Sequence, residues 1–308
     1  MKILIFGIAS AIGRALTAEL LERGHDVCGQ EHPKADGGPE GVRVWRGDLR
    51  RSIAHEAIRE ERPDAVVHLG TVSPFGGGSR AEAIKRLNLQ GTRAVLDAVR
   101  RCGVGQLLFV GSHAYYGAAP DLSVCHREDD PPHAVETFPE LADLVAADLM
   151  TASAMCGLSG TRTSILRVCH CIGASGRGML SQLLRGHRVP TVLGFDPVVQ
   201  FLDERDVALA LSVALEHRLM GIYNVGGTRP LPLSTIAQKL GRVVTPFPEG
   251  LFRLSVGRFG MANLPSGALS HFKYSIVIDD GLFRSRTGFV PKFDEDAALS
   301  AFREVFPA

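Results

Sequence analysis

The stretch KILIFGIASAIGRALTAELLERG, residues 2–24, decides the fold of this 308-residue chain. Its first six residues, 2–7, form an apolar run that ends at a glycine, which predicts a buried strand. Residues 14–24 place apolar side chains at helical spacing and end at Gly24, which predicts a helix. A strand, a glycine-containing turn and a helix in this order are typical of a phosphate-binding site.

The turn itself reads GIASAIGR, residues 7–14. Glycine lets the backbone approach a pyrophosphate closely, and the N-terminus of the next helix presents N–H groups and a partial positive charge. A turn of this kind also occurs without a ligand. We favour dinucleotide binding, because the turn opens the chain and an acidic residue follows at a suitable interval. The expected contacts come from Gly7, Ser10, Ala11, Ile12 and Gly13.

The acidic residue is Glu31, which follows a second expected strand at 25–30. A carboxylate at this position accepts hydrogen bonds from the adenosine ribose 2′-OH and repels a 2′-phosphate. NAD is therefore favoured as cofactor, and NADP stays open because His32 and Lys34 are close by. The alternative is that Glu31 is an ordinary solvated surface acid.

Further apolar strands alternate with helix-length segments through the first two-thirds of the chain. We expect these strands at 42–47, 64–70, 106–112, 163–169 and 221–227, and long helices at 81–103 and 140–157. Such alternation predicts an α/β fold with a doubly wound, Rossmann-type parallel sheet.

The last third of the chain is rich in glycine and proline between short helical pieces. We expect it to form a small substrate-binding lobe beside the sheet. The dinucleotide-binding core then covers residues 1–172 and continues at about 200–226, and the lobe takes residues 173–199 and 227–308.

Composition excludes several classes of protein. The 34 Lys+Arg residues nearly balance the 33 Asp+Glu residues, so no attraction to nucleic acid or to a membrane surface is indicated. No apolar run approaches the roughly 18 residues of a membrane helix, and the amino terminus does not resemble a signal peptide. Six scattered cysteines without a CxxC pair favour a reduced, cytoplasmic protein.

The sequence Cys169–His170–Cys171 raises the question of a metal site. On a strand, the two thiols would point to one face and the imidazole to the other, which opposes shared ligation of one ion. A zinc site also needs about four ligands. We therefore expect no metal, and expect both cysteines to be small apolar core residues.

Nine motifs occur in an order that resembles one family. They are GIASAIG (7–13), GDLR (47–50), VVHLGTVS (66–73), LNLQGTRAVLDA (87–98), FVGSHAYYG (109–117), ILRVCHCIG (165–173), VQFLDERDVALA (199–210), IYNVGG (222–227) and RTGFVP (286–291). The chain resembles the extended short-chain dehydrogenase/reductase family, in its NAD-dependent epimerase/dehydratase group, whose members often act on nucleotide sugars.

The resemblance implies further site residues and a partner. It places Asp48 and Leu49 beside the adenine and makes Ser112 the catalytic serine. The strand end and helix start that line the cofactor are represented by Leu69, Gly70, Thr71 and Asn88. It also implies a small-molecule substrate and a homodimer that pairs through the helices at 81–101 and 140–157.

One departure affects the chemistry. The family's proton donor is the tyrosine of a Tyr-x-x-x-Lys motif on the helix before ILR. This chain has no tyrosine between Tyr116 and Tyr223, and no lysine between Lys85 and Lys239. Leu141 or Leu144 takes the tyrosine position, depending on the register.

Four residues near the expected site are candidate substitutes: Ser112, His113, Tyr115 and His170. These residues can also have no catalytic role. Tyr115 can pack against the sheet, and His113 can be a polar residue at a strand end. Ser112 and His113 are unsuited as a hydrolase nucleophile and base, because neighbouring strand residues face opposite sides.

The helix at 140–157 offers two further candidate substitutes, the acids Asp143 and Asp148. We expect both to be exposed carboxylates of an amphipathic helix.

Three functions are compatible with these residues. The first is an atypical NAD-dependent oxidoreductase, epimerase or dehydratase that acts on a polar, sugar-like molecule. The second is a non-catalytic dinucleotide-binding protein, either a sensor or a structural subunit. The third is a non-redox lyase or isomerase that uses His113 or His170 as base. The two enzyme hypotheses require a titratable group near the nicotinamide, whereas the non-catalytic dinucleotide-binding protein does not.

Overall fold

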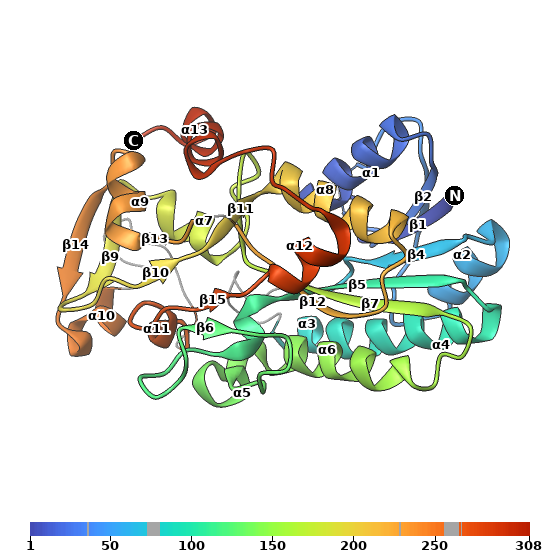
Figure 1. Cartoon of the computed structure of the whole chain (residues 1–308), viewed down its shortest axis with the longest axis horizontal. Coiled ribbons are helices and arrows are strands. Elements are labelled where there is room, and N and C mark those ends of the chain that lie inside the picture. Colours follow the sequence, from blue (N-terminus) through green and yellow to red (C-terminus); the bar gives the residue numbers. More distant parts are fainter. Residues whose placement is uncertain (36, 73–80, 228, 256–264, 266) are drawn as a thin grey trace.

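The computed structural model describes residues 1–35, 37–72, 81–227, 229–255, 265 and 267–308. Its centre is a seven-stranded sheet in which all neighbours are parallel, with the order β12-β7-β5-β4-β1-β2-β3 (Figure 1). Its strands are β1 (Lys2–Phe6), β2 (Asp26–Glu31), β3 (Arg43–Arg46), β4 (Ala65–His68), β5 (Gln106–Ser112), β7 (Arg162–Val168) and β12 (Gly221–Val225). The predicted α/β class and parallel sheet are confirmed.

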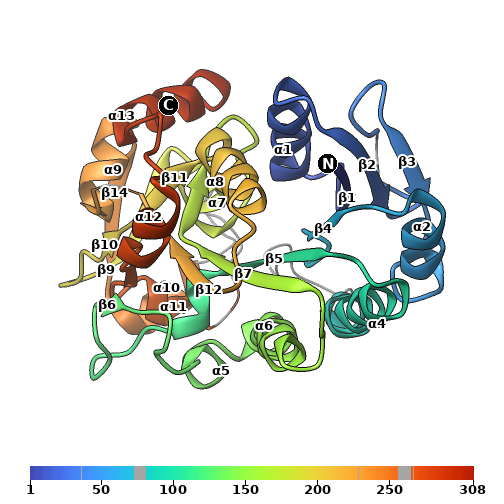
Figure 2. The ribbon, with the colours of Figure 1, turned by 45° about the vertical axis from the view of Figure 1, so that its right-hand side comes forward.

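Helices cover both faces of the sheet, as Figure 2 shows. On one face, α1 (Ala11–Glu22) packs beside α8 (Glu204–Glu216). The other face is covered by α2 (Ile53–Glu61), α4 (Thr92–Cys102) and α6 (Ala142–Met155). Because both faces are covered, β1 and β4 are almost continuously apolar and buried.

The helix expected at 81–103 is three pieces rather than one. α3 (Ala81–Arg86) leads into a π-helical turn (Leu87–Gly91), and α4 follows. The turn contains Asn88, which is fully buried. Its Oδ1 accepts from the N–H of Val72 at 2.7 Å, and its Nδ2 donates to Asp143 Oδ2 at 2.6 Å. Single π-turns are frequent at functional sites, and this one places an amide side chain between strand β4 and helix α6.

The remaining elements lie around the carboxyl ends of the strands and at the end of the molecule opposite the N-terminus (Figure 1). The short strands are β6 (Cys125–His126), β8 (His170–Ile172), β9 (Arg188–Val192), β10 (Val198–Val199), β11 (Phe201–Asp203), β13 (Leu231–Pro232), β14 (Val243–Phe247) and β15 (Val277–Ile278). The helices are α5 (Ala134–Thr137), α7 (Met179–Leu184), α9 (Leu233–Lys239), α10 (Glu249–Ser255), α11 (Ala268–His271), α12 (Gly281–Thr287) and α13 (Glu295–Val305). No helix within the described ranges has the length and apolar character needed to cross a membrane.

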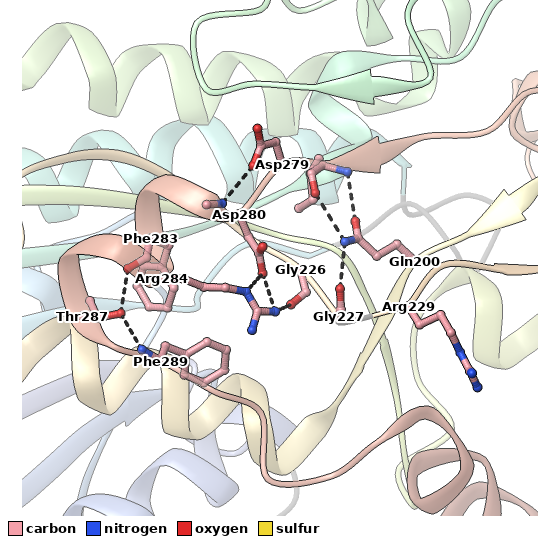
Figure 3. A network of polar contacts seen from close by, with 12 residues as sticks. Gln200, Gly226, Gly227, Arg229, Asp279, Asp280, Phe283, Arg284, Thr287 and Phe289 are labelled. Atoms are coloured by element: carbon pink, nitrogen blue, oxygen red, sulfur yellow. Dashed lines mark hydrogen bonds and ion pairs between the residues drawn. The ribbon is translucent and has the colours of Figure 1, made fainter.

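A buried glutamine ties the C-terminal segments to the core (Figure 3). Gln200 Nε2 donates to the carbonyl oxygens of Gly227 at 3.0 Å and Ile278 at 3.3 Å. Its Oε1 accepts from the N–H of Ile278 at 2.9 Å. One side chain therefore joins strand β15 to the loop that follows β12. Nearby, Arg284 is paired with Asp280 at 2.7 Å.

Candidate functional site

The phosphate turn joins β1 to α1 with very little space. Gly7 has a φ of +84°, and a Cβ there would lie 2.8 Å from the carbonyl oxygen of Leu69. A Cβ on Gly13 would lie 2.6 Å from the carbonyl oxygen of Ile8. Both positions therefore require glycine, because the turn packs directly on neighbouring backbone.

Ser10 stands where the family has its middle glycine, and the structure gives it a local role. It is the N-cap of α1, and its Oγ accepts from the N–H of Gly13 at 3.0 Å. Ala11 and Ile12 form the first positions of the helix, whose amides have no acceptor inside the helix. These amides and the helix dipole suit a pyrophosphate.

Glu31 lies at the end of β2, against the same turn. Its Oε2 accepts from the N–H of Ala9, and its Oε1 accepts from the N–H of His32, both at 2.9 Å. Two backbone donors thus hold the carboxylate beside the turn, where the ribose of a bound adenosine is expected.

A cavity of about 430 Å³ continues from Glu31 along the ends of β2 and β3. Its walls are formed by His32, Pro33, Lys34, Gly47, Asp48, Arg51, Ser52, Ile53 and Glu56. Asp48 is held by hydrogen bonds from Arg50, which lower the pKa of its carboxyl to about 2. Leu49, the next residue, is buried. The cavity includes Asp48, which the resemblance predicts to lie beside the adenine.

A second cavity, of about 200 Å³, lies between the carboxyl end of β5 and helix α6. Its polar lining residues are Thr71, which lies near the end of β4, Ser112, Tyr115 and Asp148. The remaining walls are Phe109, Val110, Gly111, Ala114, Leu141, Leu144 and Val145. Carboxyl ends of parallel strands are where open α/β sheets bind their ligands. Both leucines proposed for the tyrosine position line this cavity, Leu144 from α6 and Leu141 from the turn before it, so this wall is mainly apolar.

Ser112 ends strand β5 and caps the 3₁₀ turn that follows (His113–Tyr116). Its Oγ accepts from the N–H of Ala114 at 3.2 Å. Tyr115, in the same turn, is 7% exposed, and its ring lies under the guanidinium of Arg167. Of the first four candidate substitutes, these are the two that the structure brings into the cavity wall.

The other two candidates, His113 and His170, pack against each other. His113 Nδ1 donates to the carbonyl oxygen of Val168 at 3.1 Å, and its ring meets that of His170 edge-on at 4.2 Å between centroids. Burial lowers the pKa of His113 to about 4 and that of His170 well below its usual range. Neither residue lines either of the two cavities. As expected for neighbouring residues, Ser112 and His113 face different surroundings.

The expectation that Asp143 and Asp148 are exposed is wrong. Their exposed fractions are 7% and 2%. Asp143 meets Asn88 of the π-turn, and Asp148 forms a two-point ion pair with Arg167, with distances of 2.8 and 3.1 Å. Each acid is buried because a neighbouring element supplies a hydrogen-bonding partner.

Arg167 was not identified from the sequence as a site residue. It lies within β7, is 1% exposed and also donates to Tyr116 Oη and to the carbonyl oxygen of Glu128. An arginine inside an apolar strand needs a buried counter-charge, and this was the available signal.

Cys169 is buried, and Cys171 is partly buried. Burial raises the pKa of the Cys171 thiol to about 12. Among the residues that the structure describes, no group of three His, Cys, Asp or Glu side chains is arranged to hold a metal ion.

Comparison with known proteins identifies the family. The model of the NAD dependent epimerase/dehydratase family matches residues 3–226. An uncharacterized protein of Mycobacterium tuberculosis is 28% identical over 274 residues, which are 85% of this chain and 70% of that protein. The UDP-glucose 4-epimerase of Corynebacterium glutamicum is 27% identical over 250 residues, 73% of this chain and 75% of that protein.

The fold is also that of a solved epimerase. The crystal structure of Thermus thermophilus UDP-glucose 4-epimerase in complex with NAD superposes with a TM-score of 0.78 at 23% identity, and covers 99% of each chain. With the family model spanning the sheet, the phosphate turn and the second cavity, the chain belongs to the NAD-dependent epimerase/dehydratase family.

Proposed function

We propose that this protein is an atypical NAD-dependent oxidoreductase, epimerase or dehydratase that acts on a polar, sugar-like molecule, and that residues of the second cavity replace the Tyr-x-x-x-Lys relay. The observation that carries the proposal is the 200 Å³ cavity at the end of β5, which contains Ser112 and Tyr115. The relatives named UDP-glucose 4-epimerase support a nucleotide sugar as substrate. A solved protein of similar fold, MoeE5, is in complex with UDP-glucuronic acid and NAD.

The chain's own residues would divide the work as follows. The amides at the start of α1 hold the phosphates, and Glu31 holds the adenosine ribose. The apolar wall of Phe109, Val110 and Leu144 excludes water, which strengthens polar contacts inside the cavity. Ser112 Oγ orients the reacting oxygen of the substrate by a hydrogen bond. A nicotinamide in this cavity would supply the two-electron exchange with a carbon–oxygen bond.

The reaction can be tested with NAD and a panel of UDP-glucose, UDP-glucuronic acid and dTDP-glucose, with products separated by chromatography. We expect Ser112→Ala to lower kcat about a hundredfold or more, because a placed hydroxyl at the reacting oxygen is lost. NAD affinity should stay within about twofold, since Ser112 lies outside the phosphate turn. The exposed Ser123, changed to alanine, is the matched control. Full activity of Ser112→Ala would contradict this assignment.

Cofactor preference gives a second test. We expect NAD to raise the melting temperature more than NADP does, because a ligand stabilises the folded state according to its affinity. Glu31→Gln keeps the shape of the side chain and removes the charge that repels a 2′-phosphate. Its ratio of NADP to NAD affinity should rise about tenfold. Lys34→Ala in the same background should reduce that gain. An unchanged ratio in Glu31→Gln would show that Glu31 does not select the cofactor.

A non-catalytic dinucleotide-binding protein is the second candidate. The specific observation in its favour is the apolar wall formed by Leu144 and Val145 of α6 and by Leu141, which directly precedes this helix. This function predicts stabilisation by NAD without turnover of any sugar in the panel.

A further inference from the structure

Tyr115 occupies an unusual place in the second cavity. It lines the cavity beside Ser112, whereas helix α6 presents leucine, valine and Asp148 to the same space. Helix α6 itself contains neither tyrosine nor lysine. Tyr115 is therefore the only tyrosine among the described residues that line this cavity.

A cation lies directly against that phenol. The Cζ atom of Arg167 is 3.5 Å from the centroid of the Tyr115 ring, and Arg167 is 1% exposed. Its guanidinium is fixed from two sides. Asp148 accepts two hydrogen bonds from it, and the Tyr116 hydroxyl and the Glu128 carbonyl oxygen accept from its third nitrogen. A guanidinium held in this way keeps its charge and its position.

We propose that Tyr115 and Arg167 form a phenol–cation pair that transfers the substrate proton in place of the Tyr-x-x-x-Lys pair, and that Asp148 is the positioning residue of Arg167. The proposal rests on the proposed function and names the acid–base group of that site. The phenol comes from the turn after β5, the cation from β7 and the positioning carboxylate from α6.

The proton balance is simple. When a substrate carbonyl is reduced, the O–H bond of Tyr115 breaks and a new O–H bond forms on the substrate oxygen, while the electron pair for the carbon comes from the reduced nicotinamide dinucleotide. The phenolate left behind is stabilised by the Arg167 charge over its ring. In the oxidative direction the same phenolate takes the proton of a substrate hydroxyl.

Four influences act on the phenol. Burial raises the pKa of Tyr115, the charge of Arg167 lowers it, the charge of Asp148 raises it, and a side-chain hydrogen bond with Arg167 lowers it. The neighbouring ring of Tyr116, at 5.3 Å between centroids, has its pKa raised to about 12 by burial. Removing the charge of Asp148 should therefore lower the pKa of Tyr115, and removing the charge of Arg167 should raise it. An ion pair that only stabilised the fold, far from the phenol, would change neither.

The first experiment follows tyrosinate absorbance in the full-length protein at alkaline pH. The chain has four tyrosines, so the difference between each variant and its Tyr115→Phe counterpart isolates Tyr115. Asp148→Asn keeps Arg167 and should lower the pKa of Tyr115 by about one unit or more. The double variant Arg167→Met with Asp148→Leu should raise it, and it removes both charges together, so no buried charge is left unpaired.

Asp143→Asn is the matched control, because it changes a buried acid on the same helix that faces Asn88 instead of Arg167. Circular dichroism at each pH confirms that the fold is intact. A shift in Asp148→Asn and in the double variant, but not in Asp143→Asn, supports the pair. The same Tyr115 titration in all of these proteins overturns it.

The second experiment uses turnover of the sugar panel. Tyr115→Phe keeps the ring over Arg167 and should lower kcat about a hundredfold or more, while NAD affinity stays within about twofold. Turnover that persists at the wild-type kcat in Tyr115→Phe overturns the proposal, although the proposed function would stand. If the wild-type protein turns over no sugar, the proposed function fails, and the proton-transfer role fails with it, whereas the titration still decides whether the charges act on the phenol.

Discussion

Lowering the pH from about 7.5 to about 5 is expected to remove most of the protein's free energy of unfolding. The cause is four histidines whose pKa is lowered by burial; His68, His113 and His271 are buried, and His170 is partly buried. Burial lowers the pKa of His68 and His113 to about 4, that of His271 to about 3 and that of His170 well below its usual range. The unfolded chain exposes them all, with a pKa of about 6.5.

The sign follows from proton uptake. Below about pH 6.5 the unfolded state binds protons that the folded state cannot accept, so the contribution of these residues is complete above that pH and is lost as the pH falls toward about 4. At pH 5 each of His68, His113 and His271 costs about 2 kcal/mol, because 1.5 pH units correspond to that energy. These three together reach about 6 kcal/mol, and His170 acts in the same direction. Typical domains possess about 5–15 kcal/mol.

Contacts of these rings explain why protonation is not accommodated. His68 Nδ1 accepts from the N–H of Gly70, so a proton there would break the hydrogen bond. The rings of His113 and His170 meet edge-on, and a charge on either would oppose one on the other. Asp148 and Asp206, whose pKa is raised by burial, act in the opposite direction and reduce the total loss.

Urea unfolding at the two pH values measures the effect. His271→Phe removes one of the four groups and preserves a ring against Phe138, so its loss between the two pH values should be smaller by about 2 kcal/mol. The exposed His187, changed to glutamine, is the matched control and should show the wild-type loss. Free energies of unfolding that agree within about 1 kcal/mol at both pH values would contradict the prediction.

The sheet could be predicted because its strands carry their own signal. Residues 106–112 form an apolar run bounded by glycine and serine, and the observed β5 has the same bounds. Helices α2 and α8 have no counterpart among the sequence predictions. The α8 sequence ERDVALALSVALE is apolar on nearly all sides, since nine of its residues are buried, so helical periodicity is weak. The π-turn at 87–91 was missed because it depends on tertiary partners of Asn88.

The candidate site likewise contains some residues that the sequence could predict and others that it could not. The phosphate turn is local in sequence, so Gly7, Ser10 and Gly13 could be proposed from their spacing, their place between a strand and a helix, and the acid that follows. The burial of Asp148 could not, because it is decided by Arg167, which is 19 residues away on another element. An amphipathic pattern indicates on which face of a helix a residue lies. It does not indicate whether another element places a buried partner against that face.

Gly227→Ala is expected to destabilise the folded state by about 3 kcal/mol or more. Gly227 follows β12, and an added Cβ would overlap the carbonyl oxygen of Phe201 in β11. That atom belongs to backbone paired with β8, so it cannot rotate away. Relief would require the loop to move, which would also break the hydrogen bond from Gln200 Nε2 to the Gly227 carbonyl oxygen.

Two further variants separate the causes of this loss. Gly250→Ala is the matched control, because a Cβ there meets no atom within 4 Å and its free energy of unfolding should change by less than about 1 kcal/mol. Gln200→Ala removes the hydrogen bonds to Gly227 and Ile278 without the overlap, and should cost about 1–3 kcal/mol. If the urea midpoint of Gly227→Ala matches that of Gly250→Ala, the loop is not confined by Phe201. If it falls below that of Gln200→Ala, the overlap with backbone is the larger cause, and the position accepts glycine alone.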